Sequence, residues 1–423
     1  MARLLLQAGA ETEWAAPSDT PLAYAARNGH EAVVRVLLEH GANLNFRNTT
    51  GKTPLWLAAN RGHQEVVKLL LDKGAHINLK DCNGQTPLSC AIECGHEPVV
   101  REFVARGAIV DLKSNDGQIP LILAIIRGNE EIVKLMLEKG AQVNLNSVMA
   151  GKTPLSWAIE NGHESVVRLL LDKGAETNLK NDDGRTSWTL AIEGGNQEIA
   201  KLLLHPGAQI DMPDNNGRTP LSWAAGCGCE SIVRLLLERE AQINLKDNGG
   251  WTPLSWAVVK GKEGTVRLLL ANGADAESVD NTGRTALMFA VLSGSTILTS
   301  CLLHDDNMES ADDTGRTPLS WASGGWVNQS VVRLLLERGA VVDSRDITDR
   351  TPLSYAAANG NFITVSLLLE KGAAVDSFDN HGRTPLSHAA ERRREGVVQL
   401  LLEKGAATDS VDDEGRAPYD WAV

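Results

Sequence analysis

Apolar residues recur along the chain at the spacing of short amphipathic helices, as residues 151–183 illustrate. Leu155, Ala158 and Ile159 fall at positions i, i+3 and i+4, which places them on one face of a helix. A threonine followed by proline precedes this stripe and Gly162 follows it, which is typical of a capped helix start and a glycine end. The pattern predicts a helix of about two turns that begins after Thr153.

A second helix is predicted from about Glu164 to Gly174, with Val167, Leu170 and Leu171 on its apolar face. An extended stretch and an Asp-Asp-Gly turn at 182–184 follow it. Isolated helices shorter than about 12–15 residues are only marginally stable in water. Each helix pair is therefore expected to bury its apolar faces against neighbouring pairs.

The same pair of helices is predicted to recur along the chain, since the threonine before the first helix returns every 33 residues. One spacing is 32 residues and two are 34. Ile119 and Ala417 fill the two slots of this register that lack threonine. A fixed period of this length indicates one supersecondary unit copied head to tail, so binding is expected to use an array and not a pocket. The threonines of the register are Thr20, Thr53, Thr86, Thr153, Thr186, Thr219, Thr252, Thr285, Thr317, Thr351 and Thr384.

The sequence motifs of the repeated unit resemble the ankyrin repeat: Gly-x-Thr-Pro-Leu, Ala-Ala or Ala-Ile, Gly-His, Val-Val-x-Leu-Leu-Leu and Gly-Ala. The resemblance implies an all-α solenoid of stacked helix-turn-helix units with projecting hairpin loops. It also implies that the loop tips and first helices line a concave binding side. The phrase Thr-Pro-Leu-Ser-Trp-Ala is similar to long arrays of filamentous fungi, which often belong to nucleotide-binding receptors of the innate-immunity type.

One position departs from the ankyrin pattern. Serine replaces the usual histidine after Thr-Pro-Leu, and because the resemblance implies that this histidine ties neighbouring units by hydrogen bonds, we expect a different local network here. The serines concerned are Ser89, Ser156, Ser222, Ser255, Ser320, Ser354 and Ser387.

A single array is predicted over residues 1–423, with a half repeat at 1–19, about twelve full repeats at 20–416 and a partial terminal repeat at 417–423. Both ends cut through a repeat, whereas terminal units of such arrays normally carry a polar cap. We interpret the chain as a fragment of a longer array or as the product of an unusual gene boundary.

Composition narrows the class of protein further. Aromatic residues make up 4% of the chain, as expected where small and aliphatic residues let flat units stack closely. The net charge of −13 argues against nucleic-acid binding, which needs a dense basic surface. Neither a membrane-spanning apolar run nor a signal peptide is evident, and the six cysteines form no Cys-x-x-Cys pair. We therefore expect an intracellular protein, in the cytoplasm, with free thiols.

Candidate chemical motifs are explained by the repeat. The histidines that follow the helix-ending glycine, among them His30, His63 and His96, are spread one per unit and do not predict a metal site. Gly-Lys-Thr at 51–53 and 151–153 lacks the earlier glycine of a phosphate-binding loop, and no serine lies in a Gly-x-Ser-x-Gly turn. We predict no catalytic residues, no cofactor and no metal.

A column of basic residues lies between the turn glycine and the threonine. Aspartates of the same turns, such as Asp280 and Asp312, are expected to pair with these side chains within or between units. Alternatively, the column contributes to binding an acidic partner. Its members are Lys52, Lys152, Arg185, Arg218, Arg284, Arg316, Arg350, Arg383 and Arg416.

Departures from the consensus are the best candidates for partner specificity. Trp251 replaces the basic residue of the column, and large aromatic side chains are favoured as interface anchors. Core packing does not readily explain tryptophan there, so we predict a binding role, with a locally packed surface residue as the alternative. Other tryptophans, among them Trp157, Trp223, Trp256, Trp321 and Trp421, share one slot of the first helix and are expected to pack between units.

Further exceptions lie towards the end of the chain. Trp326 stands beside an inserted residue, and Arg392–Arg394 is the densest basic run, which is either a site or sequence drift. Arg393 and Asp349 occupy glycine slots, so each either adopts a positive φ or remodels its turn. The 295–330 segment lacks one residue and a Gly-Ala pair, which makes it a candidate hinge or weak interface unless it is a harmless loop variant.

We therefore predict a scaffold that binds partner proteins through the concave face of the array. The predicted partner-binding residues are Trp251, Arg218, Arg284, Trp326, Arg392 and Arg394. The alternative is the ligand-sensing portion of a larger nucleotide-binding receptor of the immune type. Fold alone does not identify the partner.

Overall fold

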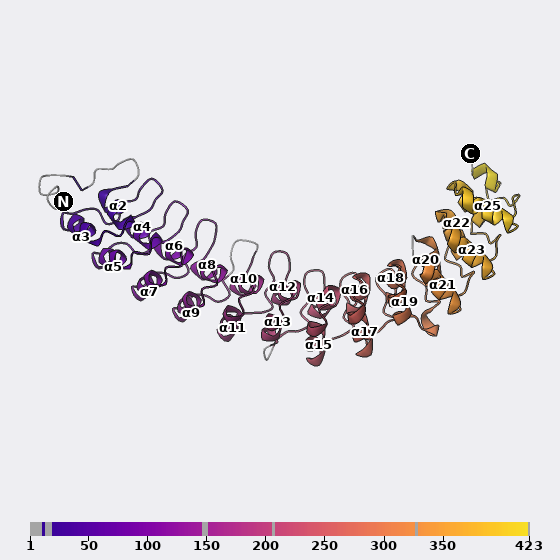
Figure 1. Ribbon diagram of the computed structural model, residues 1–423, viewed down its shortest axis with the longest axis horizontal. Coiled ribbons are helices and arrows are strands. Elements are labelled where there is room, and N and C mark those ends of the chain that lie inside the picture. The colour runs from indigo at the N-terminus through magenta and orange to yellow at the C-terminus, as the bar shows by residue number, and fades with distance from the viewer. Residues whose placement is uncertain (1–10, 13–18, 146–150, 205–207, 326–328, 422–423) are drawn as a thin grey trace. The chain divides into compact units, whose positions relative to one another are not determined.

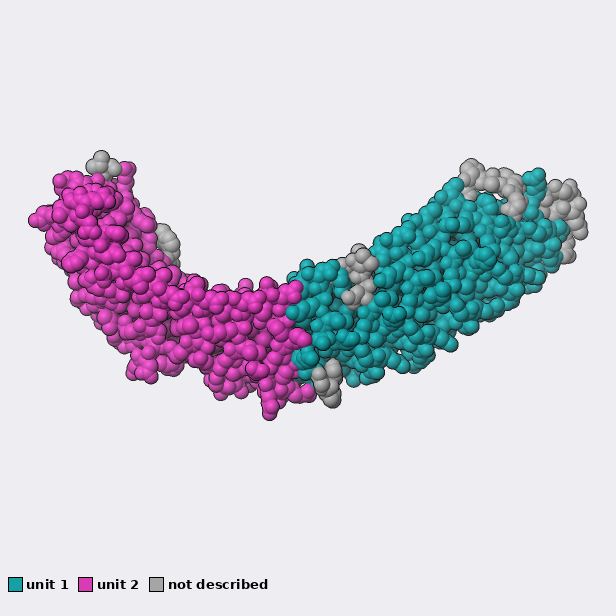
Figure 2. Space-filling view, turned by 180° about the vertical axis from the view of Figure 1, so that it is seen from behind, with its two compact units in different colours: residues 1–209 teal, residues 210–423 magenta. Residues whose placement is uncertain are grey.

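The computed structural model describes residues 11–12, 19–145, 151–204, 208–325 and 329–421. The chain divides into two compact units, residues 1–209 (unit 1) and residues 210–423 (unit 2), which Figure 2 colours separately. Each unit is built from helix pairs, and the described residues contain no strand, so the predicted all-α fold class is confirmed. The prediction of one continuous array through both units stays a prediction.

The helices of unit 1 alternate between a first helix of seven residues and a second helix of seven or nine. The first helices are α2 (Pro21–Arg27), α4 (Pro54–Asn60), α6 (Pro87–Glu93), α8 (Pro120–Ile126), α10 (Pro154–Glu160) and α12 (Ser187–Glu193). The second helices are α3 (Glu31–Glu39), α5 (Gln64–Asp72), α7 (Glu97–Ala105), α9 (Glu130–Glu138), α11 (Glu164–Asp172) and α13 (Gln197–Leu203).

Unit 2 repeats the same alternation. Its first helices are α14 (Pro220–Cys227), α16 (Pro253–Val259), α18 (Ala286–Leu292), α20 (Pro318–Gly324), α22 (Pro352–Asn359) and α24 (Pro385–Glu391). Its second helices are α15 (Glu230–Glu238), α17 (Glu263–Ala271), α19 (Thr296–Leu302), α21 (Gln329–Glu337), α23 (Phe362–Glu370) and α25 (Glu395–Glu403). Two short 3-10 helices, η1 (Asp305–Asn307) and η2 (Pro418–Trp421), complete the unit.

Within each unit, first helices pack on first helices and second helices on second helices, as α4 does on α6 and α20 does on α22. Figure 1 shows these two rows in each unit. The apolar stripes predicted from the sequence face inwards: Leu155, Ala158 and Ile159 are buried in α10, and Val167 and Leu170 in α11, whereas Leu171 is half-buried. Each helix pair thus buries its faces on its neighbours, as its short length requires.

The register threonines cap the first helices. Thr153 accepts a hydrogen bond from the Ser156 amide at 3.1 Å, and Thr86 forms a reciprocal capping box with Ser89. Ile119 has no side chain able to cap α8, which starts at Pro120 without such a bond. The proline supplies the fixed φ of the first turn in both cases.

The serines that replace the family's histidine form the different network expected from the sequence. Ser89 Oγ lies 2.7 Å from Thr86 Oγ1 within one repeat. In unit 2 the capping threonine also reaches the turn after the second helix, since Thr351 Oγ1 lies 3.0 Å from Ser377 Oγ. The threonine-serine pair therefore holds the helix start and, at Thr351, the capping threonine also links it to the end of its own repeat.

The histidines before the second helices join neighbouring repeats. Nε2 of His63 donates to the Arg27 carbonyl and Nε2 of His96 donates to the Asn60 carbonyl, each at 3.0 Å. These bonds satisfy carbonyls at the ends of the preceding first helices, which have no partner within the helix. They supply the structural role that the one-per-unit spacing indicated.

Three residues other than glycine adopt a positive φ among those described: Asp349 at 59°, Arg393 at 53° and Glu240 at 64°. The first two confirm the left-handed turn as the outcome at these glycine slots, rather than a remodelled one. Glu240 ends α15 where the sibling repeats have glycine, and the sequence analysis did not single it out. Such residues are strained relative to glycine.

The shortened segment after α19 is tied down by a buried asparagine. Asn307 accepts a hydrogen bond from the His304 amide at 2.9 Å and donates to the Leu302 carbonyl at 2.8 Å. It also donates to the Glu277 carboxylate of the preceding turn at 2.9 Å. These bonds replace those of the missing Gly-Ala pair and join two repeats, which favours the harmless-variant interpretation over a weak interface.

Candidate binding face

Arginine side chains stack on aromatic rings along the first helices of unit 2. The arginine lies just before the capping threonine, and the ring lies five residues later in the first helix, so the two meet at the helix start. We call this set the arginine-aromatic column: Arg218, Trp223, Trp251, Trp256, Arg284, Phe289, Arg316, Trp321, Arg350, Tyr355, Arg383, Arg416 and Trp421.

Contacts of the column occur both within a repeat and between neighbouring repeats. The guanidinium carbon of Arg218 lies 3.7 Å from the ring centres of both Trp223 and Trp256. Trp223 belongs to the same repeat as Arg218 and Trp256 to the next, so one cation joins two first helices. Cation-π contacts of this kind are worth about 0.5–2 kcal/mol each. The tryptophans of the shared slot thus pack between repeats, as the sequence predicted.

In several repeats of unit 2 an aspartate of the turn orients the ring beside it. Asp312 Oδ1 accepts the amide hydrogens of Thr314 and Arg316 at 2.9 and 3.0 Å, while its Oδ2 accepts from Trp321 Nε1 at 2.9 Å. In the same way, Oδ2 of Asp214 accepts from Trp223 Nε1 at 2.9 Å, and Oδ2 of Asp247 accepts from Trp256 Nε1 at 2.8 Å. One carboxylate therefore fixes both the turn and the ring.

Tyrosine and histidine replace tryptophan in two repeats and keep the bond to the aspartate. The Tyr355 hydroxyl donates to Asp346 Oδ2, and His388 Nε2 lies 2.9 Å from Asp379 Oδ2. Burial and the bond to Asp346 raise the pKa of Tyr355 to about 12. Burial would raise the pKa of the Asp346 carboxyl, but the hydrogen bonds from Tyr355 and its own turn lower it instead. Asp346 is therefore ionised at neutral pH.

The predicted aspartate-arginine pairing holds in some turns and not in others. Asp280 pairs with Arg284 at 3.0 Å and Asp412 with Arg416 at 2.9 Å. Asp312 forms no ion pair within 4.0 Å among the described residues, because its second oxygen is occupied by Trp321. At Asp312 the indole of Trp321 occupies the oxygen that holds the arginine at Asp280, whereas Asp412 pairs with Arg416 although Trp421 also carries a donor.

Trp251 contacts two rings of the column. Its ring centre lies 4.8 Å from that of Trp256 and 4.9 Å from that of Phe289, with the planes tilted by 56° and 52°. These tilted contacts give the packing explanation that the sequence analysis lacked. Trp251 is half-buried, and its indole N–H donates no hydrogen bond within the described chain. Its role in partner binding stays a prediction.

The structure brings three of the predicted binding residues together. Arg218 stacks on Trp256, which contacts Trp251, and Arg284 lies 5.0 Å from the ring of Phe289, the second neighbour of Trp251. Arg218, Trp251 and Arg284 thus belong to one continuous stack.

The remaining predicted residues lie apart from this stack. Arg394 precedes α25 and its Nε donates to the Ala358 carbonyl at 3.3 Å, which is the structural role of the histidine in other repeats. Arg392 ends α24 and is exposed. Trp326 lies outside the described residues.

The comparisons with known proteins follow the same register. A family model described as ankyrin repeats, three copies, matches residues 1–81, 77–147, 146–214, 206–280, 262–346 and 341–412. The chain belongs to the ankyrin-repeat family. Ankyrin repeats are protein-interaction modules. No curated protein matches the sequence.

Metal chemistry and membrane insertion find no site in the described part of this ankyrin-repeat chain. Its His, Cys, Asp and Glu side chains gather nowhere in a group of three suited to a metal ion. None of its helices is both long and apolar enough to span a bilayer.

Unit 1 carries a weaker version of the column. Lys52 lies 4.1 Å from the Trp56 ring centre and Lys152 lies 4.6 Å from that of Trp157. Lys152 also pairs with Glu160, and Arg185 with Glu193, each through an acid eight residues later. Lys152 and Arg185 are thus neutralised within their own repeats.

Exposed apolar side chains at the turns of unit 2 were missed by the sequence analysis of this ankyrin-repeat chain. Ile347 is 71% exposed and Phe378 is 60% exposed. Each stands next to the buried turn aspartate, at Asp346 and Asp379 respectively. The available signal was a bulky apolar residue beside the turn aspartate.

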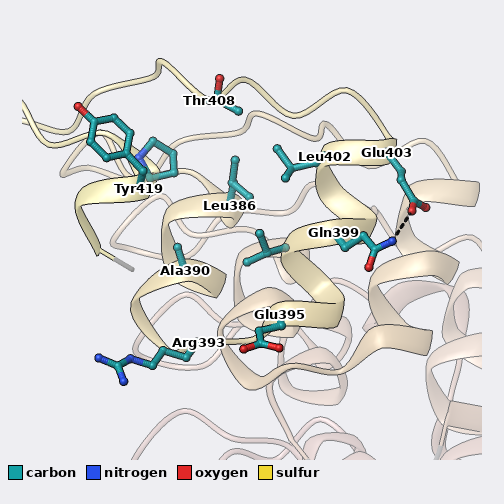
Figure 3. A pocket seen from close by; sticks show the side chains of 11 residues that line it. Leu386, Ala390, Arg393, Glu395, Gln399, Leu402, Glu403, Thr408 and Tyr419 are labelled. Carbon is teal, nitrogen blue, oxygen red and sulfur yellow. Dashed lines mark hydrogen bonds between the residues drawn. The ribbon is translucent and has the colours of Figure 1, made fainter. Parts of the chain in front are cut away.

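A hollow of about 1010 Å³ lies against the last helix pair of unit 2 (Figure 3). Leu386 of α24 and Val398 and Leu402 of α25 line it, with Tyr419 from η2 at its edge. Leu402 is 44% exposed. Val398 is half-buried, whereas Val365, the corresponding residue of the preceding repeat, is fully buried. No helix among the described residues covers α25 on this side, so its apolar face stays open.

Proposed function

We propose that this ankyrin-repeat chain is a non-catalytic scaffold that binds a partner protein through the face formed by the turns and first helices of unit 2, with Trp251 as the anchor. The resemblance noted above implies that this face is the concave one. The observation that carries the proposal is the half-buried Trp251 ring with a free indole N–H, held between two other rings.

Preorganisation makes Trp251 a favourable anchor. Its contacts with Trp256 and Phe289 restrict the ring before any partner arrives, so little rotamer entropy is lost on binding. Its free N–H is available to a carbonyl of the partner. Arg218 and Arg284 flank it, and tryptophan and arginine are the side chains enriched at interface hot spots.

The proposal keeps the expectations on class and location. The net charge of −13 disfavours a nucleic-acid partner, and the six free cysteines suit a reducing intracellular compartment such as the cytoplasm. The alternative of a sensing portion of a larger nucleotide-binding receptor stays a prediction.

A capture experiment with variants at one residue tests the anchor. The chain is immobilised, partners are captured from the source cell, and the same capture is repeated with Trp251→Ala and Trp251→Arg. Arginine is the residue of sibling repeats at this slot, so the second variant keeps the column and removes only the ring. We expect both variants to lose specific partners, by at least about tenfold in affinity for a true hot spot.

Two controls make the outcome decisive. Circular dichroism verifies that each variant keeps its helices, and Trp157→Ala in unit 1 removes a ring outside the proposed face. Capture of every partner at wild-type level by both Trp251 variants would remove Trp251 as the anchor. Equal loss with Trp157→Ala would assign the effect to the fold and not to this face.

A further inference from the structure

Arg316 and Arg350 of the column lack the acidic partner that Arg284, Arg383 and Arg416 have. Arg284 pairs with Asp280 at 3.0 Å, and Arg383 pairs with Glu391 at 2.6 Å. Arg316 and Arg350 form no ion pair with any residue that the structure describes. Both are half-buried, with part of each side chain open to solvent.

The sequence explains the missing acids at one slot. Arg383 meets a glutamate eight residues later, at the end of its first helix, as Lys152 and Arg185 do in unit 1. The corresponding residue is Gly324 for Arg316 and Ala358 for Arg350. Neither residue carries a carboxylate, so the partner present in sibling repeats is absent from these two.

The turn aspartates do not replace it. Oδ2 of Asp312 accepts from Trp321, and Oδ2 of Asp346 accepts from Tyr355, while the other oxygen of each carboxylate holds the turn amides. Asp280 is free to hold Arg284 because the ring in its repeat is Phe289, which has no donor. The carboxylates beside Arg316 and Arg350 are therefore already occupied.

Stacking fixes both cations on one ring. The guanidinium carbons of Arg316 and Arg350 lie 4.1 and 4.3 Å from the ring centre of Tyr355, and Arg316 also lies 3.7 Å from that of Trp321. Arg316 gives one hydrogen bond to the Ser320 carbonyl at 3.0 Å, and Arg350 donates none from its side chain. Desolvation lowers the pKa of Arg316, as expected for a cation with too little compensation.

We propose that Arg316 and Arg350 bind carboxylate side chains of an acidic segment of the partner protein. Both arginines stack on the ring of Tyr355, at one junction between repeats. This proposal rests on the proposed function, since it names the chemistry of the partner on the same face. An acidic segment supplies the two carboxylates that the fold withholds, and arginine hydrogen-bonds carboxylates in bidentate geometry.

A nucleic acid fits this site less well than an acidic peptide. Nucleic acids need many cations along the strand, whereas the neighbouring Arg284, Arg383 and Arg416 are already paired with acids of the chain. The net charge of −13 would repel an extended polyanion. A short acidic stretch places its charge only where the two unpaired cations lie.

One substitution tests the proposal by supplying the missing acid. Ala358→Glu places a glutamate at the slot from which Glu391 reaches Arg383, so it should neutralise Arg350 from within. Ala358→Gln has the same size without the charge and is the matched control. Binding is measured at low salt with fluorescein-labelled hexaglutamate, with hexaglutamine as the neutral probe and a short single-stranded oligonucleotide as the polyanion.

We expect the wild-type chain to bind hexaglutamate about tenfold more tightly than hexaglutamine, since one charge-assisted hydrogen bond is worth about 1.5–3 kcal/mol. Ala358→Glu should lower this affinity about fivefold, and Ala358→Gln should leave it within about twofold. Arg350→Gln should lower the affinity for hexaglutamate as much as Ala358→Glu does. It tests the same arginine if the new glutamate disturbs the helix. Arg383→Gln, whose side chain already has an acid, should change binding less than about twofold.

Three outcomes overturn the proposal: equal binding of hexaglutamate and hexaglutamine, equal affinities for Ala358→Glu and Ala358→Gln together with an unchanged Arg350→Gln, or tighter binding of the oligonucleotide than of hexaglutamate. Each is separable from failure of the scaffold function. If Trp251→Ala still abolishes partner capture while these variants bind alike, the scaffold stands and only its acidic partner is wrong.

Discussion

The guanidinium carbon of Arg316 lies 3.7 Å from the centre of the Trp321 ring, within the same repeat. The same guanidinium carbon lies 4.1 Å from the ring centre of Tyr355 in the following repeat. A cation placed between two rings of successive repeats contributes to the interface between those repeats, and in a repeat protein that interface carries much of the stability. The column is therefore a structural element as well as a candidate binding face.

Removing this cation should weaken unit 2. We expect Arg316→Ala to lower the free energy of unfolding by about 2 kcal/mol, because two partly desolvated cation-π contacts and the hydrogen bond to the Ser320 carbonyl disappear together. Arg316→Lys keeps the charge but loses the planar stacking, so its loss should be about half as large. Urea unfolding followed by tryptophan fluorescence measures both variants, and an unchanged midpoint for Arg316→Ala would contradict the structural role.

Most of the fold was predictable from the sequence because the same few signals recur in register. Thr153, Pro154 and Gly162 mark one helix, and their repetition defines the others. The stacking of Arg316 on Tyr355 was not predictable, because it joins residues from different repeats whose relative placement depends on how the helices pack. The pairing of turn aspartates with arginines was predicted for Asp280 and Asp312, and it holds only for Asp280. What decides between them is whether the neighbouring ring carries a donor.

Trp251 shows the limit of reasoning from exceptions alone. Its slot identified it as unusual, but its contacts with Trp256 and Phe289 appear only once successive first helices lie side by side. Glu240 was missed although the signal was present: it occupies a glycine slot, as Asp349 and Arg393 do, and its φ is likewise positive.

His388 should make unit 2 sensitive to mild acid. Burial, followed by the charges of Arg350 and Arg383, lowers its pKa from 6.5 to about 4, although Asp379 opposes this shift. Below pH 6.5 the unfolded chain therefore binds a proton that the folded chain refuses, so stability is complete above this pH and falls as the pH drops towards 4. The difference corresponds to about 3 kcal/mol.

Replacing the histidine isolates this contribution from that of the carboxylates. Tryptophan is the residue of sibling repeats at this slot, and its indole N–H would donate to Asp379 as Trp321 does to Asp312. The stability difference between His388→Trp and the wild-type chain should grow between pH 6.5 and 4 and stay constant above pH 6.5. Thermal melting across this range measures it, and parallel curves for the two proteins would rule out the histidine as the source.

The strained turn at Arg393 should yield stability when relaxed. Arg393 holds a φ of 53°, in the region where residues other than glycine are disfavoured by about 1–2 kcal/mol. Arg393→Gly is therefore expected to stabilise the chain by about 1 kcal/mol. Arg392→Gly is the control, because the φ of Arg392 is −97° and glycine relieves no strain there. Chemical unfolding compares the two, and a destabilised Arg393→Gly would show that the side chain outweighs the strain.

Asn307 should be essential to the shortened repeat, although it lies in no helix pair. It is buried, and its side chain bonds to the Leu302 carbonyl, the His304 amide and Glu277 of the preceding turn. Asn307→Ala leaves the first two of these backbone groups without a partner in the interior, at a cost of about 2 kcal/mol. Asn272→Ala, at an exposed helix end in the preceding repeat, removes one comparable bond and should cost about 0.5 kcal/mol. Hydrogen exchange then locates the effect: we expect faster exchange in α17 and α19 for Asn307→Ala alone, because the asparagine joins the repeats that contain these helices. Unchanged protection in both helices would mean that the interface does not depend on Asn307, and the segment would again be a candidate hinge.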